Sequence, residues 1–208
     1  MTENNKIRLA VLLSGGGTTL ENILEHIDVG KLDADVAVVI SSRADAYGLE
    51  RAKKHGVPAR LVARKDFSST KEHAAAVNAV IDEFNPDLIV LAGFMSLLKI
   101  EPEYIGKIIN IHPALIPAFC GHKMYGHHVH EAVLEYGAKI SGCTVHFVDE
   151  EYDNGPVILQ KVVPVQEDDT PETLAARVFQ AECQAYPEAI QLFAEGRLEI
   201  EGRRVRVH

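Results

Sequence analysis

An asparagine and a histidine two residues apart, Asn110 and His112, form the motif with the clearest chemical potential in this sequence. If Ile111 between them packs into a β-strand, the period of two places both polar side chains on the opposite face. An amide donor beside a group that titrates near neutral pH can polarise a carbonyl and stabilise the oxyanion formed when a nucleophile adds to it. The alternative is a structural histidine that bonds to a loop carbonyl.

A second candidate is Asp153, which opens the turn-forming run Asp153-Asn154-Gly155-Pro156. In one interpretation its carboxylate bonds to its own backbone and stabilises the turn. In the other it lies near His112, where it orients the imidazole or moves a proton. Separation along the chain does not decide between the two.

A third candidate is the run Ser14-Gly15-Gly16-Gly17-Thr18-Thr19, which follows an apolar segment and precedes a helical pattern. Glycines at a strand-to-helix turn let backbone N–H groups converge on an anion, and the helix N-terminus adds a partial positive charge. The run lacks the lysine of a nucleotide-binding P-loop. The alternatives are a phosphate-binding loop and a simple tight turn.

Histidines are dense in the second half of the chain: His112, His122, His127, His128, His130 and His146. A metal site is one interpretation, but there is no HExxH motif and no acidic residue at a familiar ligand spacing. A solvated loop that approaches an anionic substrate explains the same residues more simply. We therefore expect no metal.

The elements that position these residues follow from the apolar pattern. Continuous apolar runs bounded by glycine or proline predict buried strands, and they alternate with helical patterns, which indicates a mostly parallel sheet covered on both faces. The expected strands are 7–13, 35–41, 59–62, 88–92 and 108–111. The first expected helix follows Thr18-Thr19, which would cap it. Two further helices are expected over 46–55 and 70–84.

Beyond residue 112 the pattern changes. A loop over 113–126 precedes a helix at 130–136, two strands at 141–148 and 157–165, a long helix at 171–194 capped by Thr170, and a hairpin over 198–207. The fold class is therefore a Rossmann-like α/β fold with an antiparallel C-terminal extension.

Composition narrows the class of protein. The chain has 208 residues, enough for one domain, and a formal net charge of −9, which argues against a broad nucleic-acid-binding face. No apolar run approaches the ~20 residues that span a bilayer, and Met1–Lys6 has no signal-peptide core. The three cysteines, Cys120, Cys143 and Cys183, form no CxxC pair. We expect a cytoplasmic protein without nucleic-acid or membrane partners.

The order of these motifs resembles the phosphoribosylglycinamide formyltransferase family, the folate-dependent GAR transformylases, over about residues 7–197. No single match is specific, but their order and spacing together are. The matching segments are 13–17, 44–52 (Ala-Asp-Ala-Tyr-Gly-Leu-Glu-Arg-Ala), 91–95, 110–117, 144–148, 153–160 and 186–187.

The resemblance implies transfer of a formyl group from 10-formyltetrahydrofolate, as co-substrate, to the amine of glycinamide ribonucleotide in purine (IMP) biosynthesis. It implies a single formyltransferase domain over 1–208, with a phosphate-binding half at about 7–112 and a folate-side half at about 113–208. Asn110, His112 and Asp153 match the catalytic residues of the family. The protein is expected to work as a monomer or homodimer.

The resemblance also assigns binding residues. Gly16, Gly17, Thr18 and Thr19 match the loop for the substrate phosphate, and Glu182 matches a carboxylate that contacts the ribonucleotide. The residues that match the folate pocket are Lys71, Met95, Ser96, Leu97, Leu98, Asn110, Val148 and Asp153. The match of Lys71 to a basic residue after a Phe-x-Ser segment needs a shift of one residue.

The sequence departs from the family in four places. The phosphate loop often reads Gly-Asn-Gly-Ser-Asn, where this chain has Gly15–Thr19. An arginine often follows Phe-Met, where this chain has Ser96, and Ala114 replaces a common serine. The loop over 118–130 is unusually rich in histidine.

Two relatives share the Asn-x-His and Asp motifs. Methionyl-tRNA formyltransferase carries a further C-terminal domain, and formyltetrahydrofolate deformylase carries an N-terminal regulatory domain; we expect neither domain in this chain. The remaining alternatives are a deformylase-like hydrolase and an inactive folate- or nucleotide-binding module. Intact Asn110, His112 and Asp153 argue against the inactive module.

Overall fold

The computed structural model describes residues 6–208, so the expectation about Met1–Asn5 lies outside it. The chain forms two compact units, the first ending at Ile109 and the second covering Asn110–His208. Strand β5 (Ile108–His112) crosses this boundary. Each unit is described by itself.

Unit 1 is built on a parallel sheet. Its strands run in the order β3-β2-β1-β4, and each neighbouring pair is parallel. Leu9–Leu13 of β1 are fully buried, as expected for a strand covered on both faces. The strands, all expected from the apolar pattern, are β1 (Ile7–Leu13), β2 (Ala34–Ser41), β3 (Ala59–Leu61) and β4 (Leu88–Leu91).

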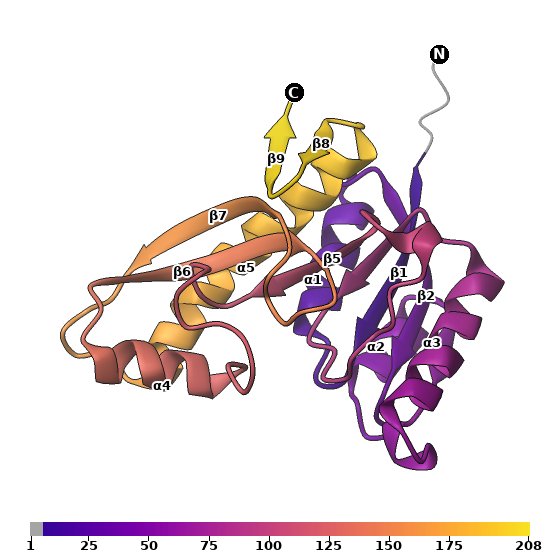
Figure 1. Cartoon of the computed structure of the whole chain (residues 1–208), viewed down its shortest axis with the longest axis horizontal. Helices are drawn as coiled ribbons and strands as arrows, with labels where there is room; N and C mark the ends of the chain where they lie inside the picture. The colour runs from indigo at the N-terminus through magenta and orange to yellow at the C-terminus, as the bar shows by residue number, and fades with distance from the viewer. Residues whose placement is uncertain (1–5) are drawn as a thin grey trace. The chain divides into compact units, whose positions relative to one another are not determined.

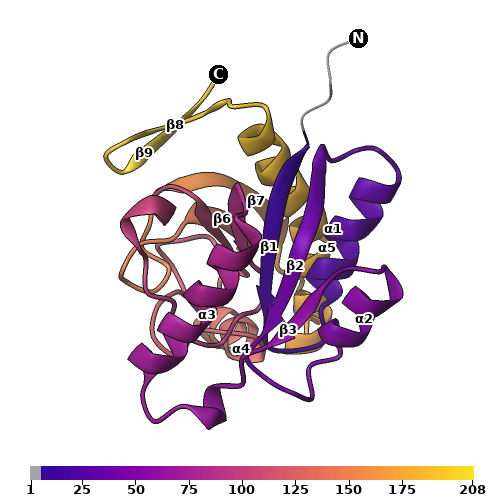
Figure 2. The same cartoon turned by 90° about the vertical axis from the view of Figure 1, so that its right-hand side faces the viewer.

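Three α-helices cover the sheet of unit 1: α1 (Thr18–Asp28), α2 (Gly48–Lys54) and α3 (Thr70–Phe84). Figure 2 shows α1 and α2 on one side of β1 and β2 and α3 on the other. Ser69 caps α3 by accepting a hydrogen bond from the backbone N–H of Glu72. Two short 3-10 helices cover Arg64–Asp66 and Pro102–Tyr104.

One expectation for unit 1 is wrong. Thr18 and Thr19 do not cap α1, because the cap position belongs to Gly17, which has no side chain to bond the first N–H groups. Gly17 has a φ of 73°, in the left-handed region that glycine enters without steric cost.

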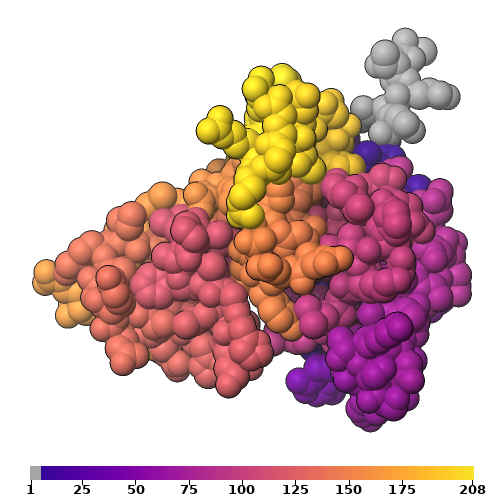
Figure 3. Space-filling model, in the orientation of Figure 1, coloured from indigo at the N-terminus to yellow at the C-terminus, as the bar shows by residue number. Residues whose placement is uncertain are grey.

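Unit 2 carries the antiparallel part of the fold (Figure 1). Strand β6 (Ile140–Phe147) pairs with β7 (Val157–Pro164) in antiparallel fashion, and β7 pairs in parallel with β9 (Arg204–Val207). Strand β8 (Leu198–Glu201) forms the expected hairpin with β9. The hairpin, yellow in Figure 3, lies at the surface.

Two helices complete unit 2. The long helix α5 (Pro171–Ala194) packs on β6 and β7 and contacts α4 (His127–Tyr136), which begins three residues earlier than expected. Thr170 caps α5, as expected, by accepting a hydrogen bond from the N–H of Thr173. Among the described residues no helix is long and apolar enough to cross a membrane.

Candidate active site

Asn110 and His112 lie on β5 and reach the same carboxylate, that of Asp153. The Asn110 amide nitrogen lies 3.5 Å from Asp153 Oδ1, and His112 Nδ1 lies 3.4 Å from Oδ2. Both side chains therefore point the same way from the strand, as the period of two predicts. The structure thus brings together in unit 2 three residues of which Asn110 and Asp153 lie 43 positions apart in the sequence.

His112 makes both of the contacts that the sequence left open as alternatives. Its Nε2 lies 2.8 Å from the carbonyl oxygen of Phe119 in the loop, while Nδ1 faces Asp153. Because each ring nitrogen faces an oxygen acceptor, the protonated imidazole is the form with both N–H groups bonded.

Burial determines the resting charge of His112. Loss of hydration lowers the pKa of His112, and the charge of Asp153 and the bond to the Phe119 carbonyl offset this only in part. The resting ring is therefore mostly neutral at neutral pH. A neutral ring that carries its proton on Nε2 can still donate one hydrogen bond.

Asp153 stays ionised although it is largely buried. Burial alone would raise the pKa of Asp153, but its contacts with His146 and His112 and the N–H of Gly121 together hold it below its usual value. Gly121 donates to Oδ2 over 2.9 Å. A carboxylate held in this way can orient an imidazole and accept a proton transiently.

The turn that carries Asp153 is sterically constrained. Asp153 has a φ of 52°, a conformation that few residues other than glycine, asparagine and aspartate adopt. At Gly155 a Cβ atom would lie 1.8 Å from the carbonyl oxygen of Phe147, so only glycine fits. Arg203 donates to the carbonyl of Asn154 over 2.7 Å and supports the turn from outside.

His146 is a member of this cluster to which the sequence assigned no role of its own. Its Nδ1 lies 2.8 Å from the Phe147 carbonyl, so Nδ1 carries the proton and Nε2, when the ring is neutral, accepts from Asn110 over 3.2 Å. Nε2 also lies 3.8 Å from Asp153 Oδ1. His146 thus fixes the orientation of the Asn110 amide. The sequence signals for it were the density of histidines and the matching segment 144–148, neither of which gives its contacts.

The glycine loop of unit 1 is supported by α2. The N–H of Gly48 donates to the carbonyl of Gly15 over 3.1 Å, and Arg51 donates to the carbonyl of Gly16 over 2.9 Å. A Cβ at Gly17 would lie 2.6 Å from Gly48 Cα. The carbonyls of Gly15 and Gly16 are therefore both hydrogen-bonded within the protein. The loop continues into α1, whose first N–H groups, at Thr18 and Thr19, have no side-chain cap. Free N–H groups at a helix N-terminus can bind an anion.

The predicted folate residues of unit 1 follow β4. Met95 and Leu97 are 56% and 43% exposed, and the N–H of Met95 donates to Ser14 Oγ over 2.8 Å. Ser96 and Leu98, which alternate with them along the chain, are half-buried. Lys71 is exposed at the start of α3. In unit 2, Val148 is half-buried at the end of β6.

Glu182 lies half-buried on α5, where loss of hydration raises the pKa of its carboxyl to about 7. Its charge also contributes to raising the pKa of the buried thiol of Cys143, after the larger effect of burial. Such a carboxyl can contact hydroxyl groups in either form: protonated, it can donate a hydrogen bond to a hydroxyl, and ionised, it can accept one from it.

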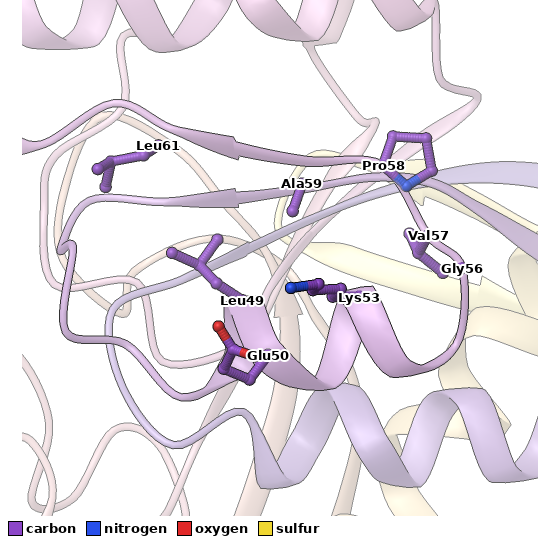
Figure 4. A pocket seen from close by; sticks show the side chains of 8 residues that line it. All are labelled: Leu49, Glu50, Lys53, Gly56, Val57, Pro58, Ala59 and Leu61. Atoms are coloured by element: carbon purple, nitrogen blue, oxygen red, sulfur yellow. The ribbon is translucent and has the colours of Figure 1, made fainter.

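A hollow of about 540 Å³ lies between α2 and β3 (Figure 4). Its lining is mostly apolar and holds none of the candidate site residues. The lining residues are Leu49, Glu50, Lys53, Gly56, Val57, Pro58, Ala59 and Leu61. Within residues 6–208 no three His, Cys, Asp or Glu side chains gather in a way that would hold a metal ion.

Comparison with known proteins defines the family. The family model described as formyl transferase matches residues 7–190. The chain therefore belongs to the formyl transferase family, as its sequence motifs indicated.

Within this family, the chain is similar to phosphoribosylglycinamide formyltransferases. It is 42% identical over 196 residues to a phosphoribosylglycinamide formyltransferase of Haemophilus influenzae, covering 93% of this chain and 90% of that protein. A crystal structure of glycinamide ribonucleotide transformylase 1 from Symbiobacterium toebii matches with a TM-score of 0.90 and 48% identity, covering 98% and 94% of the two chains. The fold class expected from the sequence is thereby confirmed.

Larger relatives contain a similar segment. The trifunctional purine biosynthetic protein adenosine-3 of Gallus gallus is 42% identical over 200 residues, which is 95% of this chain. This chain spans only 19% of that protein's length.

Proposed function

We propose that the chain transfers the formyl group of 10-formyltetrahydrofolate to the amine of glycinamide ribonucleotide, the step of purine biosynthesis after which its relatives are named. The observation that carries the proposal is the cluster in unit 2, where Asn110 and His112 each contact the carboxylate of Asp153 within 3.5 Å. The family membership and the names of the relatives support the same reaction.

The proposed reaction begins when the amine attacks the formyl carbon. A C–N bond forms and the carbonyl electron pair moves to oxygen. The Asn110 amide, oriented by His146, donates to this oxyanion. His112 donates from Nε2 once the formyl oxygen replaces the carbonyl of Phe119 as its acceptor.

The second step releases tetrahydrofolate. The bond between the formyl carbon and N10 of the folate breaks, its electron pair stays on N10, and N10 takes up the proton that the amine loses. Asp153 and His112 carry that proton, since a carboxylate and a neutral imidazole in contact can each accept it in turn. Side-chain donors stabilise the charge throughout, so we propose that no metal is required.

Binding roles follow from each unit. Gly16, Gly17, Thr18 and Thr19 bind the phosphate through backbone N–H groups, and Glu182 contacts the ribose hydroxyls. For the folate we propose contacts with Met95, Ser96, Leu97, Leu98, Lys71 and Val148, together with Asn110 and Asp153. The exposed apolar surface of Met95 and Leu97 supports this assignment.

The test is to mix the protein with 10-formyltetrahydrofolate, with and without glycinamide ribonucleotide, and to follow formation of tetrahydrofolate and of formylated ribonucleotide. We expect both products in equal amounts, only when both substrates are present, and unchanged by a metal chelator. Tetrahydrofolate and formate without ribonucleotide would instead identify the hydrolase, and no product in either mixture would identify the binding module.

We further propose that the protein acts in the cytoplasm on these small molecules alone, as a monomer or homodimer. Light scattering at working concentration distinguishes the two oligomeric states.

A further inference from the structure

The C-terminal hairpin contributes one side chain to the turn that carries Asp153. Strand β9 pairs in parallel with β7 at Val157 and Arg204, which are the first residues of the two strands. Arg203, just before β9, therefore lies beside the turn that precedes β7. Its Nη2 donates to the carbonyl oxygen of Asn154 over 2.7 Å, and its Nη1 lies 3.5 Å from Asn154 Oδ1. One guanidinium thus contacts both oxygens of Asn154.

The amide nitrogen of the Asn154 side chain is held from within the turn. It donates to Asp149 Oδ2 over 2.7 Å, and Asp149 Oδ1 accepts the N–H of Glu151 over 2.9 Å. Asn154 therefore links two anchors, Asp149 just after β6 and Arg203 on the hairpin. Because Asn154 directly follows Asp153 in the chain, the backbone position of Asp153 depends on both anchors.

Packing contributes little to the apex of this turn. Glu150 and Glu151 are exposed, and the side chain of Tyr152 is 52% exposed. A segment with few buried apolar contacts opens more easily than the core of the fold. The directional hydrogen bonds of Arg203 and Asp149 are therefore the contacts that restrain it.

The contacts of Asp153 in the candidate site tolerate little displacement of the turn. Its Oδ2 lies 3.4 Å from His112 Nδ1, and its Oδ1 lies 3.5 Å from the Asn110 amide nitrogen. Both separations exceed the range of about 2.7–3.2 Å that N–H···O bonds prefer, so a small further displacement would break them. A proton passes between two groups only within hydrogen-bond reach. The position of the turn therefore affects the rate of the proposed reaction.

We propose that Arg203 is a positioning residue for the formyl transfer: through Asn154 it holds the carboxylate of Asp153 within reach of His112. The hydrogen bonds of Arg203 go to Asn154, so it acts on the reaction through the turn. The proposal rests on the proposed function, because it requires that Asp153 takes part in the proton transfer.

The experiment measures kcat, both KM values and thermal unfolding for Arg203→Ala. We expect kcat to fall roughly three- to tenfold, the scale of one hydrogen bond, while neither KM changes by more than about twofold. Tm should change little, because Arg203 is exposed. Arg203→Lys should recover part of the loss, since an ammonium can still donate to the Asn154 carbonyl but lacks the fork that reaches both oxygens.

Arg206→Ala is the matched control. Arg206 is also exposed and lies on β9, but its guanidinium pairs with Glu201 inside the hairpin over 2.7 Å. It therefore tests whether loss of any arginine from the hairpin lowers the rate. An unchanged kcat in Arg203→Ala would overturn the proposal, as would an equal loss in Arg206→Ala.

A double variant separates positioning of Asp153 from general support of the fold. If Arg203 acts through this carboxylate, Arg203→Ala should lower kcat no further in an Asp153→Asn background. Independent effects would multiply instead, and that result would also overturn the proposal.

A measurement without turnover distinguishes failure of this proposal from failure of the proposed function. The 15N NMR chemical shifts of the His112 ring report the partners of its two nitrogens, and we expect them to change in Arg203→Ala but not in Arg206→Ala. If these shifts change and no formyl transfer is detected in the unchanged protein, Arg203 positions Asp153 and the proposed reaction is wrong. Unchanged shifts in Arg203→Ala would remove the positioning role, whether or not the transfer occurs.

Discussion

Asp153 combines two demands on one residue. Its backbone has a φ of 52°, and its carboxylate accepts from Gly121 and contacts both His112 and Asn110. A short polar side chain tolerates the left-handed conformation, whereas only an ionised carboxylate can pair with a protonated imidazole. Asparagine tolerates the left-handed conformation but cannot pair with a protonated imidazole. The substitution Asp153→Asn therefore tests the proposed catalytic role of the carboxylate without disturbing the turn.

Asp153→Asn should fold normally and lose roughly two to four orders of magnitude in kcat, the range for loss of a general acid–base group. The reason is that His112 loses the charge that favours its protonated form. Steady-state kinetics and thermal unfolding measure the two effects, with exposed Asp168→Asn as the control. A kcat within threefold of the unchanged protein would remove Asp153 from the mechanism.

Glu182 offers a prediction about pH. Loss of hydration raises its pKa to about 7 in the folded chain, above the value near 4.5 of an exposed carboxyl, so the folded state binds more protons between these values. Stability from the protonated carboxyl is complete below pH 4.5 and is lost as pH rises through 7.

Glu182→Gln should therefore raise stability relative to the unchanged protein at pH 8, with a smaller difference at pH 5. Denaturant unfolding at pH 5, 6, 7 and 8 measures this, and exposed Glu167→Gln serves as the control. The same variant should raise KM for the ribonucleotide. A stability difference independent of pH would mean that Glu182 is ionised throughout this range.

The sequence predicted part of this site. The spacing of Asn110 and His112 and the turn at Asp153 follow from local rules, and the structure places these three residues together. The contacts of His146 and Gly121 depend on the path of the loop after β5 and on the end of β6, which no local pattern specifies. Such contacts arise from tertiary structure.

At the scale of elements, α2 supports the glycine loop. The sequence singled out residues 44–52 only for their resemblance to a family, and the structure supplies a physical role for them. Gly17, which has no Cβ atom, allows the close approach to Gly48, and Arg51 bonds the carbonyl of Gly16 and the carboxylate of Glu21 on α1. One arginine thus connects the loop, α1 and α2.

Arg51→Gln should raise KM for the ribonucleotide about tenfold and change kcat little, because the phosphate is remote from the reacting carbon. The loop would lose one carbonyl partner while the N–H of Gly48 still holds Gly15. Arg51→Lys should restore part of the affinity. Lys54→Gln, on the same helix, is the control, and a change confined to the folate KM would contradict the assignment of the loop.

The elements themselves were largely predictable. The strands of unit 1 are continuous apolar runs, and α3 ends at Phe84, where the sequence predicted its end, with Asn85 in the left-handed conformation. The prediction that Thr18-Thr19 cap α1 was wrong, because the cap position requires a positive φ and is taken by Gly17. The position of α2 against the glycine loop was not predictable, because it depends on packing between glycines distant in sequence.

At the scale of the whole molecule, protons bind unequally to the folded and unfolded chains. Burial lowers the pKa of His112 and of His130, so both rings are neutral when folded and take up protons near pH 6.5 when unfolded. Stability from these histidines is therefore complete above pH 6.5 and is lost as pH falls below it. Glu182 acts in the opposite direction between pH 7 and 4.5.

The free energy of unfolding should fall between pH 7 and 5.5 by up to about 1.4 kcal/mol per pH unit for each buried histidine. His130→Gln should flatten this dependence, since its buried Nδ1 has no hydrogen-bond partner and its ring cannot charge without loss of hydration. Exposed His128→Gln should leave the slope unchanged. In a Glu182→Gln background the slope should steepen, because the opposing carboxyl no longer titrates. Denaturant unfolding at each pH measures all four chains. Equal slopes would show that these groups have the same pKa in the folded and the unfolded chain.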